Sequence, residues 1–170
     1  MTQRPSLDTR DYTAVAAAAA LATVLGFLKL YRLPQGGSIT LEAVPILFLA
    51  RWKGMRPGIV AGLLAGFLKL ILDPFIIHPV QILLDYPIPF ACLGLAAVPH
   101  RFPRVGILLA NLSRFLCHFA SGALFFASYA PEGVSVWKYS ALYNFSYVGP
   151  EAIIALFLVP PICNRITGQK

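Results

Sequence analysis

Six polar side chains lie inside long apolar runs of the sequence: Asp85, Asn111, Arg114, His118, Asn144 and Glu151. If these runs cross a membrane, each side chain is costly there and marks either a functional site or an internal pair. The carboxyl group of Asp85 and the imidazole of His118 are side chains that can exchange protons or bind a polar ligand. We expect Arg114 to play a structural role by pairing with Glu151 or Asp85. We expect Asn111 to hydrogen-bond to a neighbouring helix.

Aromatic side chains gather near the same polar residues: Tyr86, Phe125, Phe126, Tyr129, Trp137, Tyr139, Tyr143 and Tyr147. Some of these rings suit the aromatic belt at a membrane surface, whereas Tyr143 and Tyr147 fall beside Asn144 inside an apolar run. Ring faces attract an organic cation, and a carboxylate supplies the counter-charge. Histidine and asparagine add donors and acceptors for the edge of a heteroaromatic ring. The residues therefore predict an outward-facing pocket for a small, flat, cationic ligand.

Composition indicates that these residues belong to an integral membrane protein. Of 170 residues, 58% are apolar and 12% are charged, whereas soluble domains average about 25% charged residues. So few charges could not cover a soluble surface, and a disordered chain would be poor in apolar residues. A spanning helix uses about 20 residues, so roughly six helices leave no room for a soluble nucleotide-binding domain. The cysteines are single and far apart, so no metal or redox site is predicted.

Proline and glycine breaks divide the chain into apolar segments, which predict an all-α membrane protein with one domain over residues 1–170. The expected helices cover residues 12–30, 40–52, 57–72, 79–98, 105–128 and 139–162. Asp85 then lies about 10 Å below the outer end of its helix and His118 about 15 Å below, at about 1.5 Å per residue. Asn144 lies one to two turns inside the last helix. The elements thus bring these side chains together in the outer half of the membrane.

The distribution of lysine and arginine predicts the orientation. The net charge of +7 would suggest nucleic acid in a soluble protein, but in a membrane protein it marks the cytoplasmic loops. One side carries most of the basic residues: Arg4, Arg10, Arg51, Lys53, Arg56, Arg101, Arg104, Arg165 and Lys170. The opposite loops carry only Arg32 and Lys138, with Lys29 and Lys69 near helix ends. We therefore expect six spans, both termini in the cytoplasm and no nucleic-acid partner.

The first apolar segment is rich in alanine, and the spacing of its alanines allows another helix to approach closely. Ala14, Ala18 and Ala22 fall on one stripe of this helix. Ala16 and Ala20 fall on a neighbouring stripe. Such a stripe either docks a partner helix or packs against other helices of the same chain, and the spacing leaves both alternatives open.

Several stretches, in order along the chain, resemble one transport family: Leu33-Pro34-Gln35-Gly36-Gly37-Ser38, His78-Pro79-Val80-Gln81, Leu84-Asp85-Tyr86-Pro87, His118-Phe119-Ala120-Ser121-Gly122, Ser128-Tyr129-Ala130-Pro131-Glu132-Gly133, Trp137-Lys138-Tyr139-Ser140 and Tyr143-Asn144. Each stretch is weak alone. Together they resemble the thiamine-specific substrate-binding (S) component of energy-coupling factor (ECF) transporters, over nearly the whole chain.

The aromatic group and this resemblance together give a ligand-binding set: Asp85, Tyr86, His118, Gly122, Phe126, Tyr139, Tyr143 and Asn144. The resemblance implies that Asp85 takes the family's acidic ligand position. It also implies that His118, Tyr139 and Asn144 contact the aminopyrimidine of thiamine.

Two further positions of this set carry consequences from the resemblance. Gly122 would leave room beside His118, and Phe126 would stack on a ring of the ligand. The chain departs from the family because Asp85 stands where a glutamate can occur and Phe126 stands where tryptophan is expected. A shorter carboxylate and a weaker cation–π partner can both lower affinity or shift the preference among thiamine-like compounds.

The resemblance also implies the partners. S components have no catalytic residues and no cofactor of their own, and they associate with a transmembrane coupling subunit and two cytoplasmic ATPases that use the ATP. The stripe of Ala14, Ala18 and Ala22 would dock the coupling subunit. The protein would be a multi-pass protein of a prokaryotic cell membrane, surrounded by lipid, that binds thiamine from outside and then reorients.

Other functions remain open at this stage. The ligand of the same fold could be another vitamin or a thiamine precursor such as hydroxymethylpyrimidine. A small intramembrane enzyme could use His118 and Asp85 as an acid–base pair, although such enzymes usually cluster more carboxylates or histidines. A self-contained ion-coupled carrier is disfavoured, because no internal repeat or broken helix pair is evident. Residues 32–38 could close as a lid over the pocket.

Overall fold

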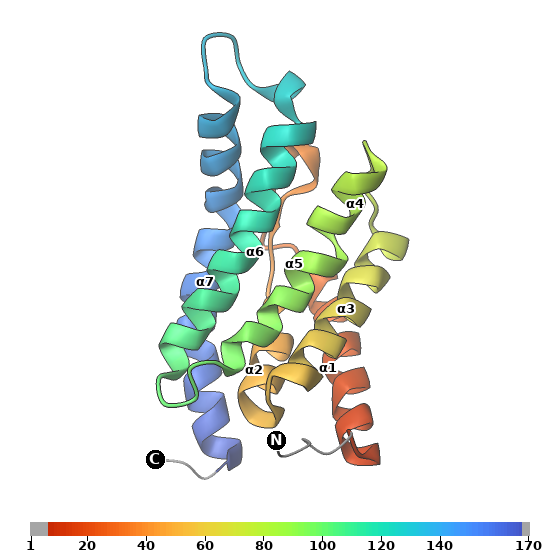
Figure 1. The fold of residues 1–170 in the computed structure, drawn as a ribbon, viewed down its shortest axis with the longest axis vertical. Helices are drawn as coiled ribbons and strands as arrows, with labels where there is room; N and C mark the ends of the chain where they lie inside the picture. Colours follow the sequence, from red (N-terminus) through yellow and green to blue (C-terminus); the bar gives the residue numbers. More distant parts are fainter. Residues whose placement is uncertain (1–6, 168–170) are drawn as a thin grey trace, which may run out of the picture.

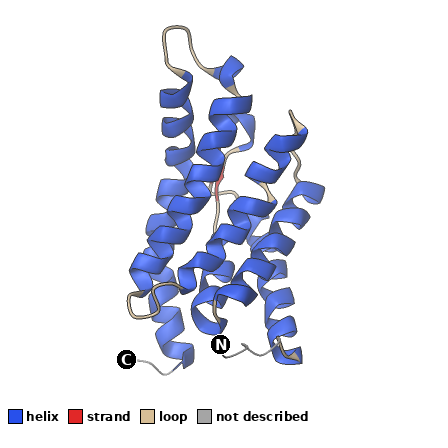
Figure 2. Ribbon diagram, in the orientation of Figure 1, coloured by secondary structure: helices blue, strands red, loops and turns tan. Residues whose placement is uncertain are grey.

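A computed structural model describes residues 7–167, which fold into an elongated helical bundle with one two-stranded sheet in this part of the chain (Figure 1, Figure 2). The helices are α1 Thr9–Phe27, α2 Ala43–Lys53, α3 Met55–Leu72, α4 Pro79–Asp85, α5 Pro87–Cys92, α6 Pro103–Phe125 and α7 Val136–Thr167. The 3-10 turns are η1 Pro34–Gly36, η2 Leu93–Ala97 and η3 Ala127–Tyr129. Strands β1 Tyr31–Arg32 and β2 Ser38–Ile39 pair antiparallel across η1.

Within residues 7–167, four helical stretches are long and apolar enough to cross a membrane: Met55–Leu72, Pro79–Ala97, Pro103–Phe125 and Val136–Ile166. They place the chain in the membrane class that its composition predicts. α1 and α2 lie at the two remaining predicted segments. α2 has 11 residues, which at about 1.5 Å per residue is roughly half of a hydrocarbon core of about 30 Å. The count of six spans therefore stays a prediction.

The predicted helix over residues 79–98 is broken in the structure, which corrects the expectation of one continuous helix. α4 ends at Asp85, and Tyr86 adopts φ −119° and ψ −83°, outside the helical region. Pro87 and Pro89 explain the break, because proline lacks a backbone N–H and disfavours helical geometry in the residue before it. The break thus determines where the Asp85 and Tyr86 side chains enter the bundle.

Close packing of α3 depends on a stripe of glycines at four-residue spacing. Gly58, Gly62 and Gly66 are all buried. A Cβ on Gly62 would lie 2.1 Å from the carbonyl oxygen of Phe90, and one on Gly66 would lie 2.5 Å from that of Tyr86. α3 therefore packs directly on the backbone of α5 and of the break before it, as small residues allow between membrane helices. This stripe was not among the predicted ones.

The alanine stripe that was predicted to dock a partner packs inside the chain. Ala18 and Ala22 are buried in two apolar clusters, and the half-buried Ala14 packs against the cluster that contains Ala18. α1 packs through this face on α2 and α3, so the stripe serves the second alternative, internal packing. Ala16 and Ala20, on the neighbouring stripe, are exposed.

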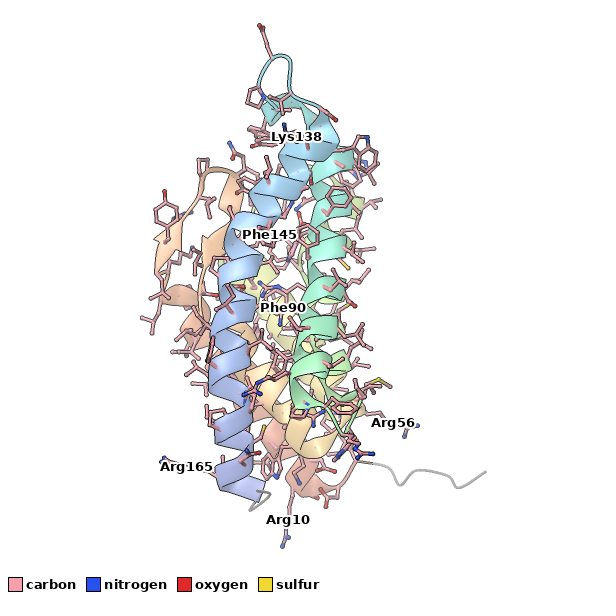
Figure 3. The ribbon with its side chains drawn as sticks, turned by 90° about the vertical axis from the view of Figure 1, so that its left-hand side faces the viewer. Arg10, Arg56, Phe90, Lys138, Phe145 and Arg165 are labelled. Atoms are coloured by element: carbon pink, nitrogen blue, oxygen red, sulfur yellow. The ribbon has the colours of Figure 1, made fainter. Side chains whose placement is uncertain are left out.

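The two ends of the bundle differ in charge. α1 begins and α7 ends at the same end of the bundle (Figure 1). Arg56 and Arg165 lie at this end, whereas Lys138 lies at the opposite end (Figure 3). Just after the C-terminal ends of α1 and α3, Lys29 pairs with Asp73. The ammonium group of Lys29 holds the pKa of the Asp73 carboxyl below its usual range.

Candidate ligand-binding site

A pocket lies between α4, α6, α7 and the β1–β2 loop, and every residue of the predicted binding set lines it: Asp85, Tyr86, His118, Gly122, Phe126, Tyr139, Tyr143 and Asn144. Arg114 and Tyr147, both singled out from the sequence for other reasons, line it as well. The pocket also has lining residues outside the predicted binding set: Gln35, Gly36, Gly37, Ser38, Glu42, Lys69, Phe75, Gln81, Phe90 and Ser140. The structure thus brings the predicted set together, while its role in binding stays a prediction.

Asp85 and His118 form the polar centre of one wall. His118 Nδ1 lies 3.2 Å from Asp85 Oδ1, and Gln81 Nε2 donates to Asp85 Oδ2 at 2.6 Å. His118 Nε2 is buried and has no hydrogen-bond partner among the described residues. When Nδ1 carries the proton that Asp85 accepts, Nε2 is an unused acceptor. The pair can therefore recognise a ligand that has both an N–H donor and a positive charge.

Asn144 connects the two long helices that form the wall. Its Nδ2 donates to the backbone oxygens of His118 and Ser140, at 3.2 Å and 2.9 Å. Its Oδ1 accepts a hydrogen bond of 2.6 Å from Tyr147 Oη. Ser140 Oγ in turn donates to the backbone oxygen of Phe119 at 2.7 Å. These bonds fix α7 against α6, so Asn144 positions the wall as well as lining it.

Gly122 lies at a close contact between α6 and α7 in this wall. A Cβ on Gly122 would lie 2.3 Å from Ser140 Oγ and 3.0 Å from Asn144 Nδ2. The glycine therefore makes room for these two side chains of α7, in addition to its predicted place beside His118.

We expect Gly122→Ala to lower the free energy of unfolding by about 1–3 kcal/mol, because the added methyl overpacks the contact between α6 and α7. Thermal unfolding of the purified protein in detergent measures this. Gly149→Ala is the matched control on α7, since a Cβ there makes only ordinary contacts, of 3.4 Å and 3.5 Å. Equal melting temperatures for the Gly122 variant and the control would contradict the prediction.

The β1–β2 loop covers one side of the pocket and is tied to α7 by Tyr143. Tyr143 Oη donates to the backbone oxygen of Pro34 and accepts from the backbone N–H of Gly37 at 3.0 Å. Gln35 and Gly36 adopt φ values of +58° and +90°, which turn the loop sharply. The loop is thus held over the pocket in this structure, and its opening as a lid stays a prediction.

The pocket floor contains a chain of buried charges. Arg114 donates from Nη1 to Glu151 at 2.7 Å and from Nη2 to Glu42 at 3.0 Å. Lys69 Nζ lies 2.8 Å and 2.7 Å from the two carboxylate oxygens of Glu42. Of the two predicted partners of Arg114, the structure therefore shows Glu151 and not Asp85, and it adds Glu42.

This floor is balanced in charge, because two carboxylates, Glu42 and Glu151, pair with one lysine and one arginine. Glu151 also accepts hydrogen bonds from the backbone N–H and the hydroxyl of Thr40, at 2.7 Å and 2.8 Å. Asp85 is then the carboxylate in the described pocket lining that has no lysine or arginine partner. A cationic ligand would find its counter-charge at Asp85 and not at the floor.

Glu42 and Lys69 were missed as site residues, although a signal for Glu42 existed. Glu42 lies inside the predicted segment 40–52, and a carboxylate there carries the same implication as Asp85. From the sequence, Lys69 was placed only near the end of its helix, and in the structure its ammonium group pairs with the buried Glu42. Only the packing of α2 against α3 reveals this pair.

Aromatic rings complete the pocket. Phe75 and Phe126 stack, with ring centroids 6.0 Å apart and planes inclined by 19°. Tyr143 lies 6.0 Å from Tyr139 between ring centroids, and 5.9 Å from Tyr147. Such faces provide an apolar surface for a flat ligand and attract a positive charge.

Two further expectations concern groups outside the binding set. Asn111 makes no interhelical bond within the described chain, which contradicts the prediction: its Nδ2 donates to Ile107 in its own helix at 2.9 Å, and its Oδ1 has no partner there. Among residues 7–167 no cluster of three or more histidine, cysteine or acidic side chains could hold a metal ion.

Comparison with known proteins identifies the family. The sequence profile of a family described as "Thiamine transporter protein" matches residues 12–169. The chain belongs to the thiamine transporter protein family. A ThiT thiamine transporter of Bacillus subtilis (strain 168) is 37% identical over 163 residues, which are 85% of this chain and 83% of that protein. A second, from Lacticaseibacillus paracasei (strain ATCC 334), is 31% identical over 121 residues, 59% of this chain and 60% of that protein.

Solved structures have the same fold as this member of the thiamine transporter family. ThiT from Listeria monocytogenes matches with a TM-score of 0.78 at 23% identity, over 90% of this chain and 96% of that one. The S component of a bacterial ECF transporter matches with a TM-score of 0.65 at 16% identity, over 94% and 96%. The resemblance stated from the sequence motifs is thus confirmed. The relatives are transporters, which favours a transport protein over the intramembrane enzyme.

Proposed function

We propose that this protein binds thiamine with high affinity from outside the cell and acts as the S component of an ECF-type importer. The observation that carries the proposal is the pocket around Asp85, which is lined by a carboxylate without a lysine or arginine partner, a histidine with an unused ring nitrogen, and aromatic rings. Membership of the thiamine transporter family supports the choice of ligand.

The chemistry of thiamine matches this pocket in three respects. Its thiazolium ring carries a fixed positive charge, for which Asp85 supplies the counter-charge. The amino group on its pyrimidine ring can donate to His118 Nε2, and Tyr139 and Asn144 lie in the same wall. Both rings of thiamine are flat and can stack on Phe126 or the tyrosines.

The transport role requires an orientation and partners, which we propose as follows. The end of the bundle that carries Arg10, Arg56 and Arg165 (Figure 3) faces the cytoplasm, since positive charge is retained there. The chain then crosses the plasma membrane of a prokaryotic cell six times, with both termini inside. It needs no cofactor of its own, because a coupling subunit and two ATPases supply the energy. The coupling subunit docks on the exposed face of α1 at Ala16 and Ala20, because Ala18 and Ala22 of the other stripe are buried inside the chain.

Calorimetry with thiamine on the purified protein in detergent tests the binding function. We expect saturable binding of one thiamine with a Kd well below about 10 μM, equivalent to more than about 7 kcal/mol. Hydroxymethylpyrimidine, the isolated pyrimidine half, is expected to compete poorly because it lacks the cation that Asp85 neutralises. If the pyrimidine competes as well as thiamine, the second candidate, an S component for the precursor, replaces the first.

A further inference from the structure

The basic end of the bundle exposes aromatic and cationic side chains around two short connections. The end of α2 and the start of α3 expose Trp52 and Arg56. The connection between η2 and α6 exposes Arg101 and Phe102, and the first turn of α6 exposes Arg104. We call Arg56, Arg101 and Arg104 the basic rim. None of these residues lines the pocket.

Arg51 holds the two connections together. Its Nη1 donates to the backbone oxygens of Ala96 and Pro99, at 3.1 Å and 3.2 Å, and its Nη2 donates to that of His100 at 2.8 Å. Its donors are thus used by the backbone, and the connection that carries Arg101 is fixed beside the end of α2.

The arginines of the basic rim have no carboxylate partner within residues 7–167, whereas the nearby Lys53 pairs with Asp11 at 3.0 Å. The guanidinium carbon of Arg101 lies 5.9 Å from the ring centroid of the exposed Phe102. A cation carried on an exposed ring suits the boundary between lipid headgroups and acyl chains.

We propose that the basic rim binds the phosphate headgroups of anionic phospholipids. Unpaired arginines at the ends of membrane helices attract anionic lipid through charge complementarity. Exposed apolar side chains beside them, Val98 at 48%, Phe102 at 57% and Val105 at 51%, favour an occupant that has acyl chains as well as a phosphate. An acidic soluble protein would match the charges but not these side chains. The inference is independent of the ligand in the pocket.

Spin-label measurements on the full-length protein in phosphatidylcholine vesicles test this inference. The vesicles contain a trace of spin-labelled phosphatidylglycerol or of spin-labelled phosphatidylcholine, and the motionally restricted signal reports the lipid at the protein surface. We expect phosphatidylglycerol to be enriched over phosphatidylcholine, and the double variant Arg101→Gln/Arg104→Gln to lower this enrichment by about threefold or more at low salt. Sodium chloride at about 0.5 M is expected to lower it in the wild type as well.

The variant Lys138→Gln is the control, since it removes an exposed cation at the opposite end of the bundle from the rim and does not line the pocket (Figure 3). It is expected to keep the enrichment, and thiamine binding by both variants checks that they fold. Equal enrichment in the rim variant and the wild type would overturn the proposal, as would insensitivity of the wild type to salt. Displacement of the labelled lipid by millimolar inorganic phosphate would also overturn it, by identifying a simple anion site. The proposal would likewise be overturned if the rim variant kept its phosphatidylglycerol enrichment and lost only its association with an acidic protein.

Discussion

Replacement of Asp85 by asparagine is expected to weaken thiamine binding by roughly 100-fold or more, about 3 kcal/mol, which is typical for removal of one partner of a buried charge pair. Asparagine keeps the size of the side chain and can still contact Gln81, which lies 2.6 Å from the present carboxylate. It removes the negative charge of Asp85, which is the carboxylate in the described pocket lining without a lysine or arginine partner. Calorimetry in detergent gives the Kd of the variant and of the wild type.

Glu132→Gln is the matched control for this prediction. It also removes one carboxylate, but Glu132 is exposed on the connection between η3 and α7 and does not line the pocket. We expect its affinity for thiamine to stay within about threefold of the wild type, since surface substitutions have small effects. Equal losses of thiamine affinity in the two variants would mean that the overall electrostatic field of the protein, and not Asp85 itself, attracts the cation. An Asp85→Asn variant with wild-type affinity would remove the main support for the proposed ligand.

Much of the candidate site could be predicted from the sequence because its signals are local. Asp85, His118 and Asn144 stand out as polar residues in apolar runs, and the helix lengths give their depth to within a few turns. The structure places all three in one wall. A polar residue in an apolar run is therefore informative even before its partners are known.

The sequence could not show which side of a helix faces the rest of the protein. The stripe of Ala14, Ala18 and Ala22 has the right spacing for close helix contact, but spacing cannot tell an external partner from α3. Lys69 has the position of a surface lysine, and only its approach to Glu42 makes it part of the pocket. The helix break at Tyr86 is a different case, because Pro87 in the sequence already disfavours helical geometry at the residue before it.

Replacement of Arg114 by methionine is expected to lower the free energy of unfolding by about 3–5 kcal/mol, because it leaves a buried carboxylate without its cation. Arg114 is 2% exposed and bridges Glu42 and Glu151, at 3.0 Å and 2.7 Å. Glu42 would keep Lys69, whereas Glu151 would keep only the two hydrogen bonds from Thr40. The destabilisation should therefore arise mainly at Glu151.

A second substitution locates the cause of this loss. In Arg114→Met/Glu151→Gln the unpaired charge is gone while the amide can still accept from Thr40, so we expect the double variant to unfold at a higher temperature than Arg114→Met alone. Arg165→Met, an exposed arginine at the end of α7, is the control and should change the free energy of unfolding by less than about 0.5 kcal/mol. Thermal unfolding in detergent measures all of them. A single variant as stable as the wild type, or a double variant less stable than the single, would contradict the assignment of Arg114 to a structural role. The opposite pattern is expected at Asp85, where affinity falls and stability changes little, because its charge has no permanently charged partner to leave behind.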